Sequence, residues 1–140
     1  VTLKVAAGGL GKVAGLMCQY HPGDFLSVHP VMSGKDYSFC ERADITVSAI
    51  IDGVDLGAEC EILTCSRRQT PGTREPNVRF YFVDHPVFRD RESIYPSPQT
   101  AKETLVFFSM WSQVVASLID QLKPDLFHCP DFHTAMAPCY

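Results

Sequence analysis

The chain has 140 residues, of which 46% are hydrophobic, 11% aromatic and 20% charged. This composition is typical of one globular domain, and it excludes a disordered, collagen-like or coiled-coil chain. Twelve Lys and Arg residues against sixteen Asp and Glu residues give a net charge of −4. Because no excess of positive charge is available to bind a phosphate backbone, nucleic acid is not an expected partner.

The most apolar segment is not expected to span a membrane. It runs from Leu105 to Leu122 and is interrupted by serine, glutamine and aspartate side chains. The chain begins with Val1 rather than Met, and no basic segment followed by an apolar one, the pattern of a secretion signal, comes after it. We therefore expect a piece of a longer protein.

Six cysteines are present, enough for three disulfides. The chain is long enough to build an ordinary apolar core without such cross-links, and no two cysteines are spaced as Cys-x-x-Cys. We expect most of the cysteines to be free, buried thiols of a cytosolic protein. They are Cys18, Cys40, Cys60, Cys65, Cys129 and Cys139.

The N-terminal part predicts a strand, a helix and a second strand. Residues 1–7 lead into Gly8-Gly9-Leu10-Gly11, and the apolar spacing that follows predicts a helix that stops at residues 21–24. Residues 25–31 are apolar enough for a buried strand, and residues 33–41 are expected to form a loop.

The middle of the chain predicts a β-hairpin. Residues 45–51 are rich in β-branched side chains, Asp52-Gly53 follows, and residues 54–64 resume a strand pattern. The expected continuation is an exposed loop over residues 66–77, a short strand over residues 78–83 and an irregular segment over residues 84–98.

The clearest predicted helix begins near Thr100. Thr100-Ala101-Lys102-Glu103 fits a capping box, in which hydroxyl and carboxylate satisfy unpaired amides reciprocally, and Pro124 ends the helix. Apolar side chains recur at intervals of three or four and predict one broad buried face. Its members are Leu105, Phe108, Trp111, Val115, Leu118 and Leu122.

The C-terminal segment is expected to hold a short buried strand over residues 126–128. A last helix, capped by Asp131, follows through Thr134. Strand and helix at both ends of the chain, around a hairpin, predict an α/β domain with a mainly parallel sheet and an inserted β-hairpin. The turns at residues 8–11 and 129–133 then lie at the carboxyl edge of the sheet, where open α/β folds bind ligands.

The glycine-rich turn is the first candidate site. Gly8-Gly9-Leu10-Gly11 before a helix lets backbone amides approach a ligand, and the helix N-terminus suits a phosphate. The pattern is neither Gly-x-Gly-x-x-Gly nor a Walker loop, so an ordinary turn is the alternative. Lys4 lies just upstream, and by itself it is most simply a solvated lysine.

The second candidate is the segment from His128 to Thr134, which holds two imidazoles, a thiol and a carboxylate. It predicts a polar site at a strand end. One alternative is a zinc site made by His128, Cys129 and His133, with Cys139 as a fourth ligand. Another is purely structural, with Asp131 as a helix cap and His128 as a core histidine.

Other polar motifs favour structural roles. Asp84-His85-Pro86 has no neighbouring nucleophile and is interpreted as an element that shapes a loop. Arg89 and Arg91 suit an anionic ligand, although a solvated face is the simpler interpretation. No Gly-x-Ser-x-Gly motif occurs, so serine hydrolase chemistry has no support.

Three segments, in this order, resemble the starch and bacterial glycogen synthases. Lys4 with Gly8-Gly9-Leu10-Gly11 resembles the N-terminal lysine–glycine motif of that family. Residues 82–88, with Arg91 and Ile94-Tyr95, resemble its central segment, which contains Asp84-His85-Pro86 here. Residues 124–135 resemble its strand and loop with the pattern His-x-x-Asp-aromatic-His.

Two details resemble one branch, the synthase region of fungal cell-wall α-1,3-glucan synthases. Phe108-Ser109-Met110-Trp111-Ser112-Gln113 is similar to a segment of those enzymes. The family usually has Asp after Gly-Gly-Leu-Gly, whereas Lys12 stands here, and the fungal enzymes also depart at this point.

The resemblance implies a GT-B glycosyltransferase, which has two Rossmann-like lobes around its active site. Residues 1–140 then form part of the N-terminal starch-synthase-type catalytic domain, without the C-terminal lobe that makes most nucleotide-sugar contacts. The implied reaction transfers glucose, with retention of configuration, from a nucleotide-glucose to an α-glucan acceptor. UDP-glucose and a cell-wall α-1,3-glucan are favoured, and ADP-glucose with an α-1,4-glucan is the alternative.

The resemblance also assigns roles to particular residues. Lys4 approaches the donor phosphates, and Gly8, Gly9 and Gly11 let backbone amides approach the donor. Three residues separate Lys4 from Gly8, whereas the family usually has one, so Lys12 is an alternative source of positive charge.

In the resemblance, His133 contacts the transferred glucose near its anomeric carbon, and Asp131 orients the loop. No metal and no cofactor are expected, because the fold works through amides and positive side chains. The parent protein is expected at the cytoplasmic face of a membrane, which it contacts only through parts outside this chain. Two other functions stay open: a non-catalytic α-glucan-binding module, and a small zinc or redox module.

Overall fold

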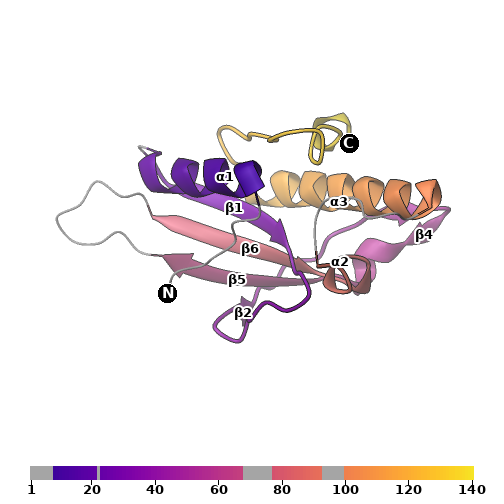
Figure 1. Ribbon diagram of the computed structural model, residues 1–140. Coiled ribbons are helices and arrows are strands. Elements are labelled where there is room, and N and C mark those ends of the chain that lie inside the picture. The colour runs from indigo at the N-terminus through magenta and orange to yellow at the C-terminus, as the bar shows by residue number, and fades with distance from the viewer. Residues whose placement is uncertain (1–7, 22, 68–76, 93–99) are drawn as a thin grey trace.

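The computed structural model describes residues 8–21, 23–67, 77–92 and 100–140. Its helices and strands, with two short 3₁₀ helices named η1 and η2, are shown in Figure 1. In chain order they are α1 (Gly8–Tyr20), β1 (Phe25–Pro30), β2 (Glu41–Arg42), β3 (Ile50–Ile51), β4 (Val54–Asp55), η1 (Leu56–Glu59), β5 (Glu61–Arg67), β6 (Val78–Asp84), α2 (Pro86–Arg89), α3 (Ala101–Leu122) and η2 (Ala137–Cys139).

The main sheet has four strands in the order β1-β6-β5-β2, and β3 pairs with β4 in a separate hairpin. β1 is parallel to β6, whereas β5 is antiparallel to both β6 and β2. The described fold is therefore α/β with a mixed sheet, and the prediction of a mainly parallel sheet is wrong for these residues. Of the strands expected at the two ends of the chain, residues 1–7 lie outside the described residues and residues 126–128 form no strand.

The sheet packs differently on its two faces. Ile62, Tyr81 and Val83 point to the face that α3 covers, where they join one buried cluster with the apolar side chains of that helix. The side chains that alternate with them, including Phe80 and Phe82, form a second cluster on the other face. From the segment of residues 31–40, Val31 belongs to this second cluster, and Tyr37 and Cys40 pack against it.

Helix α3 begins as the sequence predicts. The Thr100 hydroxyl accepts a hydrogen bond from the Glu103 amide at 3.3 Å, and the Glu103 carboxylate accepts one from the Thr100 amide at 2.9 Å. This arrangement confirms the capping box. The helix ends at Leu122, and Lys123 follows in the left-handed region at φ 47°, just before Pro124.

The buried face of α3 is rotated from the predicted one. Leu105 is 69% exposed, whereas Phe107, Met110 and Val114, which are outside the predicted stripe, are buried. Trp111, Val115 and Leu118 belong to both faces and are buried as predicted. The helix carries apolar residues around most of its circumference, so periodicity alone does not select the arc that meets the sheet.

By length and composition, α3 also qualifies as a helix that could cross a membrane. It is the only such helix among the described residues. In the structure, one side of this helix forms the centre of the larger cluster, with Met110, Val114 and Leu118 fully buried. This packing is that of a core helix.

The predicted hairpin is present but much shorter than expected. Asp52 and Gly53 have φ values of 51° and 79°, which is the conformation that a tight two-residue hairpin turn requires. The strands end after two residues on each side because Asp55 Oδ1 accepts hydrogen bonds from the amides of Ala49 and Gly57, both at 2.9 Å. These bonds start η1 where the sequence predicted a continuing strand.

The segment of residues 84–98 is not wholly irregular, because it contains α2. His85 caps this helix: its Nδ1 accepts a hydrogen bond from the Val87 amide at 3.2 Å. Pro86 occupies the first helical position, where its missing N–H costs nothing. The interpretation of Asp84-His85-Pro86 as a structural element is thus confirmed for His85 and Pro86.

All six thiols are free in the structure. Only Cys18 is buried, Cys139 is exposed, and the others are half-buried. The expectation of free thiols agrees with this arrangement, whereas the expectation that most are buried is wrong.

Trp111 provides a test of the larger cluster. Its indole is 6% exposed, and it meets the Phe88 ring edge-on at 5.7 Å between ring centroids. We expect Trp111→Ala to lower the free energy of unfolding by about 3–5 kcal/mol, because it opens a cavity in the core. Trp111 is the only tryptophan, so weak quenching of native fluorescence by acrylamide is the matching optical result, and strong quenching would contradict this placement.

Candidate functional site

The glycine-rich segment forms the start of α1 rather than a turn before it. The helix begins at Gly8, so Gly8, Gly9 and Gly11 all lie in its first turn. The first amides of a helix have no partner within the helix, and no acidic side chain occupies this first turn. These amides and the positive end of the helix dipole suit an anionic group. Lys4 lies outside the described residues.

Lys12 is described, and its side chain is exposed on α1. It directly follows Gly11 and lies about one helical turn from Gly8. The structure therefore places an accessible cation near the start of α1.

The loop of residues 130–134 is held by its own polar groups. Asp131 has φ 62°, and its Oδ1 accepts a hydrogen bond from the Phe132 amide at 2.7 Å. The Thr134 hydroxyl donates a hydrogen bond to the Pro130 carbonyl at 2.9 Å. Asp131 thus orders a turn, and the predicted α-helix is absent: turns and then η2 follow it. The left-handed backbone at Asp131 prevents a helix from starting there.

The two histidines of this segment lie in different environments. His133 is 6% exposed, and its ring lies 3.9 Å from that of Phe132 and 5.7 Å from that of Phe108 on α3, between centroids. His128 is exposed, because residues 126–128 do not enter the sheet; Leu126 is 83% exposed. The interpretation of His128 as a core histidine is therefore wrong.

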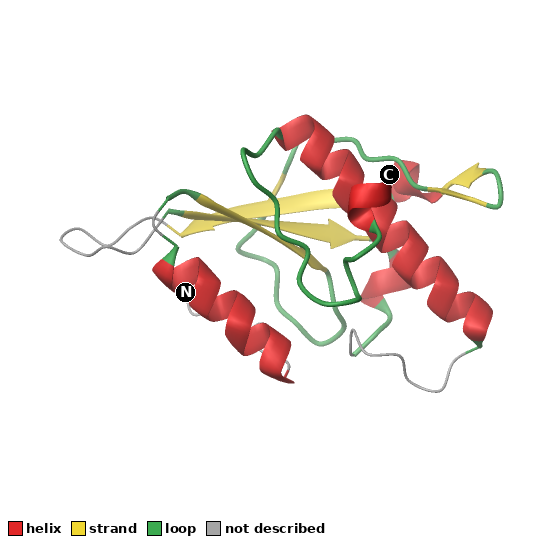
Figure 2. Cartoon of the chain, turned by 90° about the horizontal axis from the view of Figure 1, so that it is seen from above, coloured by secondary structure: helices red, strands yellow, loops and turns green. Residues whose placement is uncertain are grey.

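The candidate residues form two groups. The C-terminal segment, with Asp131 and His133, lies over α3 in both Figure 1 and Figure 2, whereas the glycines belong to α1. Their roles in binding and catalysis stay predictions. Among the described residues no three His, Cys, Asp or Glu side chains gather as metal ligands, so the zinc alternative has no ligand cluster in this part of the chain.

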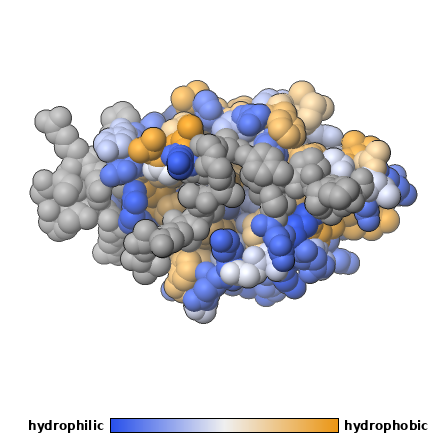
Figure 3. Space-filling model, viewed as in Figure 1, coloured by the Kyte–Doolittle hydropathy of each residue, from blue (hydrophilic) through white to orange (hydrophobic). Residues whose placement is uncertain are grey.

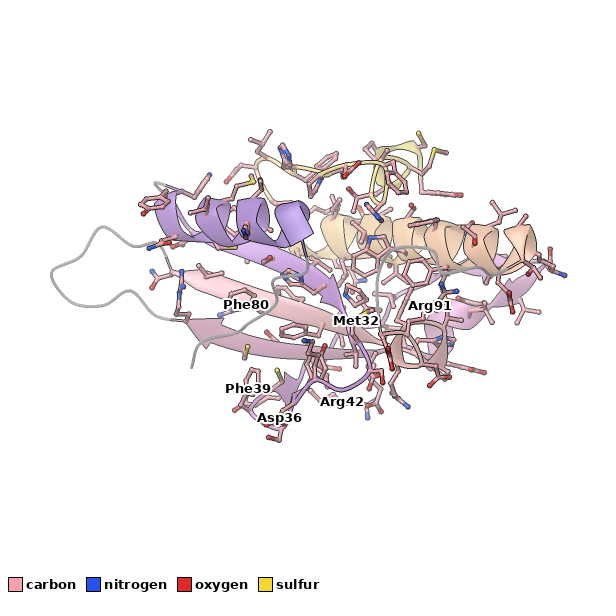
Figure 4. The ribbon with its side chains drawn as sticks, viewed as in Figure 1. Met32, Asp36, Phe39, Arg42, Phe80 and Arg91 are labelled. Carbon is pink, nitrogen blue, oxygen red and sulfur yellow. The ribbon has the colours of Figure 1, made fainter. Side chains whose placement is uncertain are left out.

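A third location emerges only from the structure, at the carboxyl ends of the parallel strands β1 and β6. The Val31 amide donates a hydrogen bond to the Val83 carbonyl at 2.9 Å, and the Ser33 amide donates one to the Arg91 carbonyl at 2.9 Å. Figure 4 shows Met32 and Arg91 near each other at this end of the sheet. An open hollow of about 620 Å³ lies here, lined by residues 31–35 and by Tyr37, Asp84 and Arg89.

The two arginines and Asp84 at this edge already have partners. Arg89 donates to Asp84 Oδ1 from Nε at 2.8 Å and from a terminal nitrogen at 2.7 Å. Arg91 donates to the Val87 carbonyl, and its guanidinium stacks on the Phe107 ring at 4.3 Å from the centroid. Both arginines thus hold the fold together, so a structural role is favoured over anion binding. Pairing the predicted strands 25–31 and 78–83 side by side would have located this edge.

We expect His29 to make the stability of the fold depend on pH. Its ring stacks on Phe82 at 5.8 Å between centroids, its Nε2 lies 2.7 Å from Ser27 Oγ, and burial lowers its pKa from 6.5 to about 4. Between these pH values the unfolded chain binds a proton that the folded chain does not. We therefore expect the free energy of unfolding to be unaffected by His29 above pH 6.5 and to decrease as the pH falls toward 4, by up to about 3 kcal/mol.

We expect His29→Gln to remove this part of the pH dependence. Urea unfolding at a series of pH values between 7.5 and 4.5 measures it. The difference in the free energy of unfolding at pH 7.5 gives the cost of the substitution itself. The slope of the free energy of unfolding against pH, below pH 7.5, gives the number of protons linked to unfolding. Equal slopes for the variant and the unmodified chain would contradict the assignment.

Comparisons with known proteins cover nearly the whole chain. The cell wall alpha-1,3-glucan synthase ags1 of Schizosaccharomyces pombe is 30% identical over 142 residues, which is 99% of this chain and 5% of the relative. The synthase mok12 of the same organism is 28% identical over 144 residues, 99% of this chain and 6% of the relative. The glycogen synthase of Thermotoga maritima is 26% identical, over 95% of this chain and 27% of the relative.

The chain thus spans only a small part of the length of these relatives. No solved structure gives a significant match. The starch synthase catalytic domain matches residues 2–140, a range that includes the start of α1, the β6–α2 segment and the loop of His133. The chain therefore belongs to the starch synthase catalytic domain family of glycosyltransferases.

Proposed function

We propose that this chain is part of the N-terminal, Rossmann-like lobe of a retaining GT-B glucosyltransferase that extends an α-glucan from a nucleotide-glucose. The observation that carries this proposal is the family match over residues 2–140, which includes the segments of both predicted site groups. The mixed α/β fold is consistent with such a lobe.

We favour UDP-glucose as the donor and a cell-wall α-1,3-glucan as the product. The relatives named as alpha-1,3-glucan synthases are 28–30% identical over 97–99% of this chain. Glycogen synthases are the second candidate, with 26% identity over 95% of the chain for the Thermotoga maritima protein. The same proposal puts the parent protein at the cytoplasmic face of a membrane, anchored by parts outside this chain.

In the proposed reaction, the departing nucleotide carries the developing negative charge. Gly8 and Gly9 begin α1, and the first amides of a helix lie where such charge is favoured; the family resemblance assigns Lys4 to the donor phosphates as well. His133 contacts the glucose near its anomeric carbon, and Asp131 holds the loop through its hydrogen bond to the Phe132 amide.

Several apolar side chains are exposed on the described residues, as expected if the rest of a larger lobe covers them. Figure 3 shows hydrophobic side chains on the upper surface of the view, where α1 and the C-terminal segment lie. Scattered apolar side chains are normal, but here several lie on each of these two elements. They are Val13, Leu16 and Tyr20 on α1, and Leu126, Phe127, Phe132, Met136 and Tyr140 in the C-terminal segment.

The purified full-length parent tests the proposal directly. It is incubated with UDP-glucose or ADP-glucose and an α-glucan primer, and the linkage of the product is determined by methylation analysis. Transfer from UDP-glucose into α-1,3 linkages supports the favoured reaction, and transfer from ADP-glucose into α-1,4 linkages supports the second candidate. Primer binding without transfer from either donor would identify a non-catalytic glucan-binding module.

We expect the 140-residue chain alone to transfer no glucose. The family places most nucleotide-sugar contacts in the second lobe, and correct positioning of both substrates supplies much of the rate of such reactions. The same assay with radiolabelled donor measures this. Transfer by the isolated chain would show that the proposed division into two lobes is wrong.

A further inference from the structure

Two cysteines face each other at the edge of the main sheet. β2 and β5 are antiparallel, with Glu41 opposite Thr64, and continuing this register by one residue puts Cys40 opposite Cys65. Both side chains are half-buried and pack against the same cluster, on the face of the sheet opposite α3. The alternation of side chains along β5 supports this placement, because Leu63 lies on the same face as Cys65 and packs against the same cluster.

The hydrogen-bond pattern determines the spacing of this pair. The Ala43 amide donates to the Ile62 carbonyl at 2.7 Å, so Ala43 and Ile62 are a hydrogen-bonded pair. Hydrogen-bonded and non-hydrogen-bonded pairs alternate along an antiparallel ladder, which makes Cys40 and Cys65 a non-hydrogen-bonded pair. The Cα atoms of such pairs lie about 4.5 Å apart, which is within the range that a disulfide spans.

The two thiol groups also influence each other's ionisation. Burial, and then the neighbouring Cys65, raise the pKa of the Cys40 thiol to about 12. Burial also raises the pKa of the Cys65 thiol, but a hydrogen bond with Cys40 opposes this rise. Cys65 is therefore the member of the pair that forms a thiolate more easily.

We propose that Cys40 and Cys65 are a redox modification site, which a low-molecular-weight disulfide of the glutathione class converts into a cross-strand disulfide. The Cys65 thiolate attacks one sulfur of the oxidant, forms a mixed disulfide and releases one small thiolate. The Cys40 thiolate then attacks the Cys65 sulfur, the protein disulfide forms, and the second small thiolate leaves. Two protein thiols lose two electrons and two protons, and the oxidant becomes two thiols.

This bond joins the rim of the hollow to the sheet. The Cys40 amide donates to the Tyr37 carbonyl at 2.9 Å, and the Tyr37 hydroxyl accepts from the Met32 amide at 3.0 Å. The segment that lines one side of the hollow is thus connected through Tyr37 to Cys40. Oxidation fixes the end of this segment to β5.

Peptide mapping of the full-length protein tests the proposal. The native protein is treated with glutathione disulfide in mildly alkaline buffer, its remaining thiols are alkylated, and it is digested with trypsin and a Glu-specific protease without reduction. Cleavage after Glu61 separates Cys65 from Cys60. We expect a linked product of residues 36–41 and 62–67, at least about tenfold more abundant than any product that joins Cys40 to Cys60.

Cys60 is the matched control. It is also half-buried, and burial raises the pKa of its thiol to about 12, but it packs in the other cluster. Cys60→Ser should leave the linked product unchanged, whereas Cys40→Ser should abolish it and leave Cys65 as the mixed disulfide. Alkylation of both cysteines in the oxidised native protein, or equal linkage of Cys40 to several cysteines as in the denatured protein, would overturn the proposal.

Discussion

Replacement of His133 by alanine in the full-length parent is expected to lower the rate of glucose transfer by about 100-fold or more. This is the scale of losing one preorganised interaction with a transition state. The family resemblance places this imidazole against the transferred glucose, and Asp131 orders the turn that carries it. The initial rate of transfer from labelled donor to primer, at saturating substrate, measures the change.

The burial of His133 requires a second variant. Its ring is 6% exposed and packs on Phe108 and Phe132, so alanine also removes packing and should lower the free energy of unfolding by about 1 kcal/mol. His133→Phe retains an aromatic ring and should retain the fold. Its rate of glucose transfer should nevertheless fall as far as that of His133→Ala. His128→Ala serves as the exposed control in the same loop, with stability nearly unchanged. Normal transfer by His133→Phe would assign His133 a structural role only.

Replacement of Gly57 by alanine is expected to lower the free energy of unfolding by at least about 3 kcal/mol. A Cβ at this position would lie 2.5 Å from the Ala49 nitrogen and 2.6 Å from the Ser48 Cα and carbonyl carbon. These are backbone atoms, which cannot rotate away as a side chain can. They belong to the segment that Asp55 anchors through its bonds to the Ala49 and Gly57 amides.

Gly15 is the matched control for this substitution. It lies in the middle of α1, and a Cβ there would have no other atom within 4 Å. Gly15→Ala should therefore raise the free energy of unfolding by about 0.5–1 kcal/mol, because alanine restricts the unfolded chain and favours a helix. Urea denaturation of both variants measures the difference. A decrease in the free energy of unfolding of no more than about 1 kcal/mol for Gly57→Ala would show that the backbone of the η1 segment shifts to accommodate the new methyl group.

Local signals predicted several elements of this protein correctly. The capping box at Thr100 and Glu103 and the Asp52-Gly53 turn formed where expected. Each of these signals depends on residues close together in the chain, such as a hydroxyl that meets an amide three residues away. The physical interaction is complete within the segment, so the sequence suffices to predict it.

Other elements depend on a partner that is distant in sequence, and local patterns predict these wrongly. Residues 126–128 have an apolar strand pattern, but a strand requires a neighbour to pair with, and the four-stranded sheet does not include them. The alternative that made His128 a core histidine fails for the same reason, because it needed that strand. Likewise, the pairing of β5 with β6 made the sheet mixed, and no local pattern distinguishes parallel from antiparallel pairing.

The sequence by itself determined the family, through motifs near residues 4–12, 82–95 and 124–135 whose order spans the whole chain. It also determined the residues proposed for the site, since those are tied to the motifs. Only the tertiary structure decided which arc of α3 is buried, where the edge of β1 and β6 lies, and that Cys40 faces Cys65. These depend on strand register and helix rotation, which are set by packing between segments far apart in the chain.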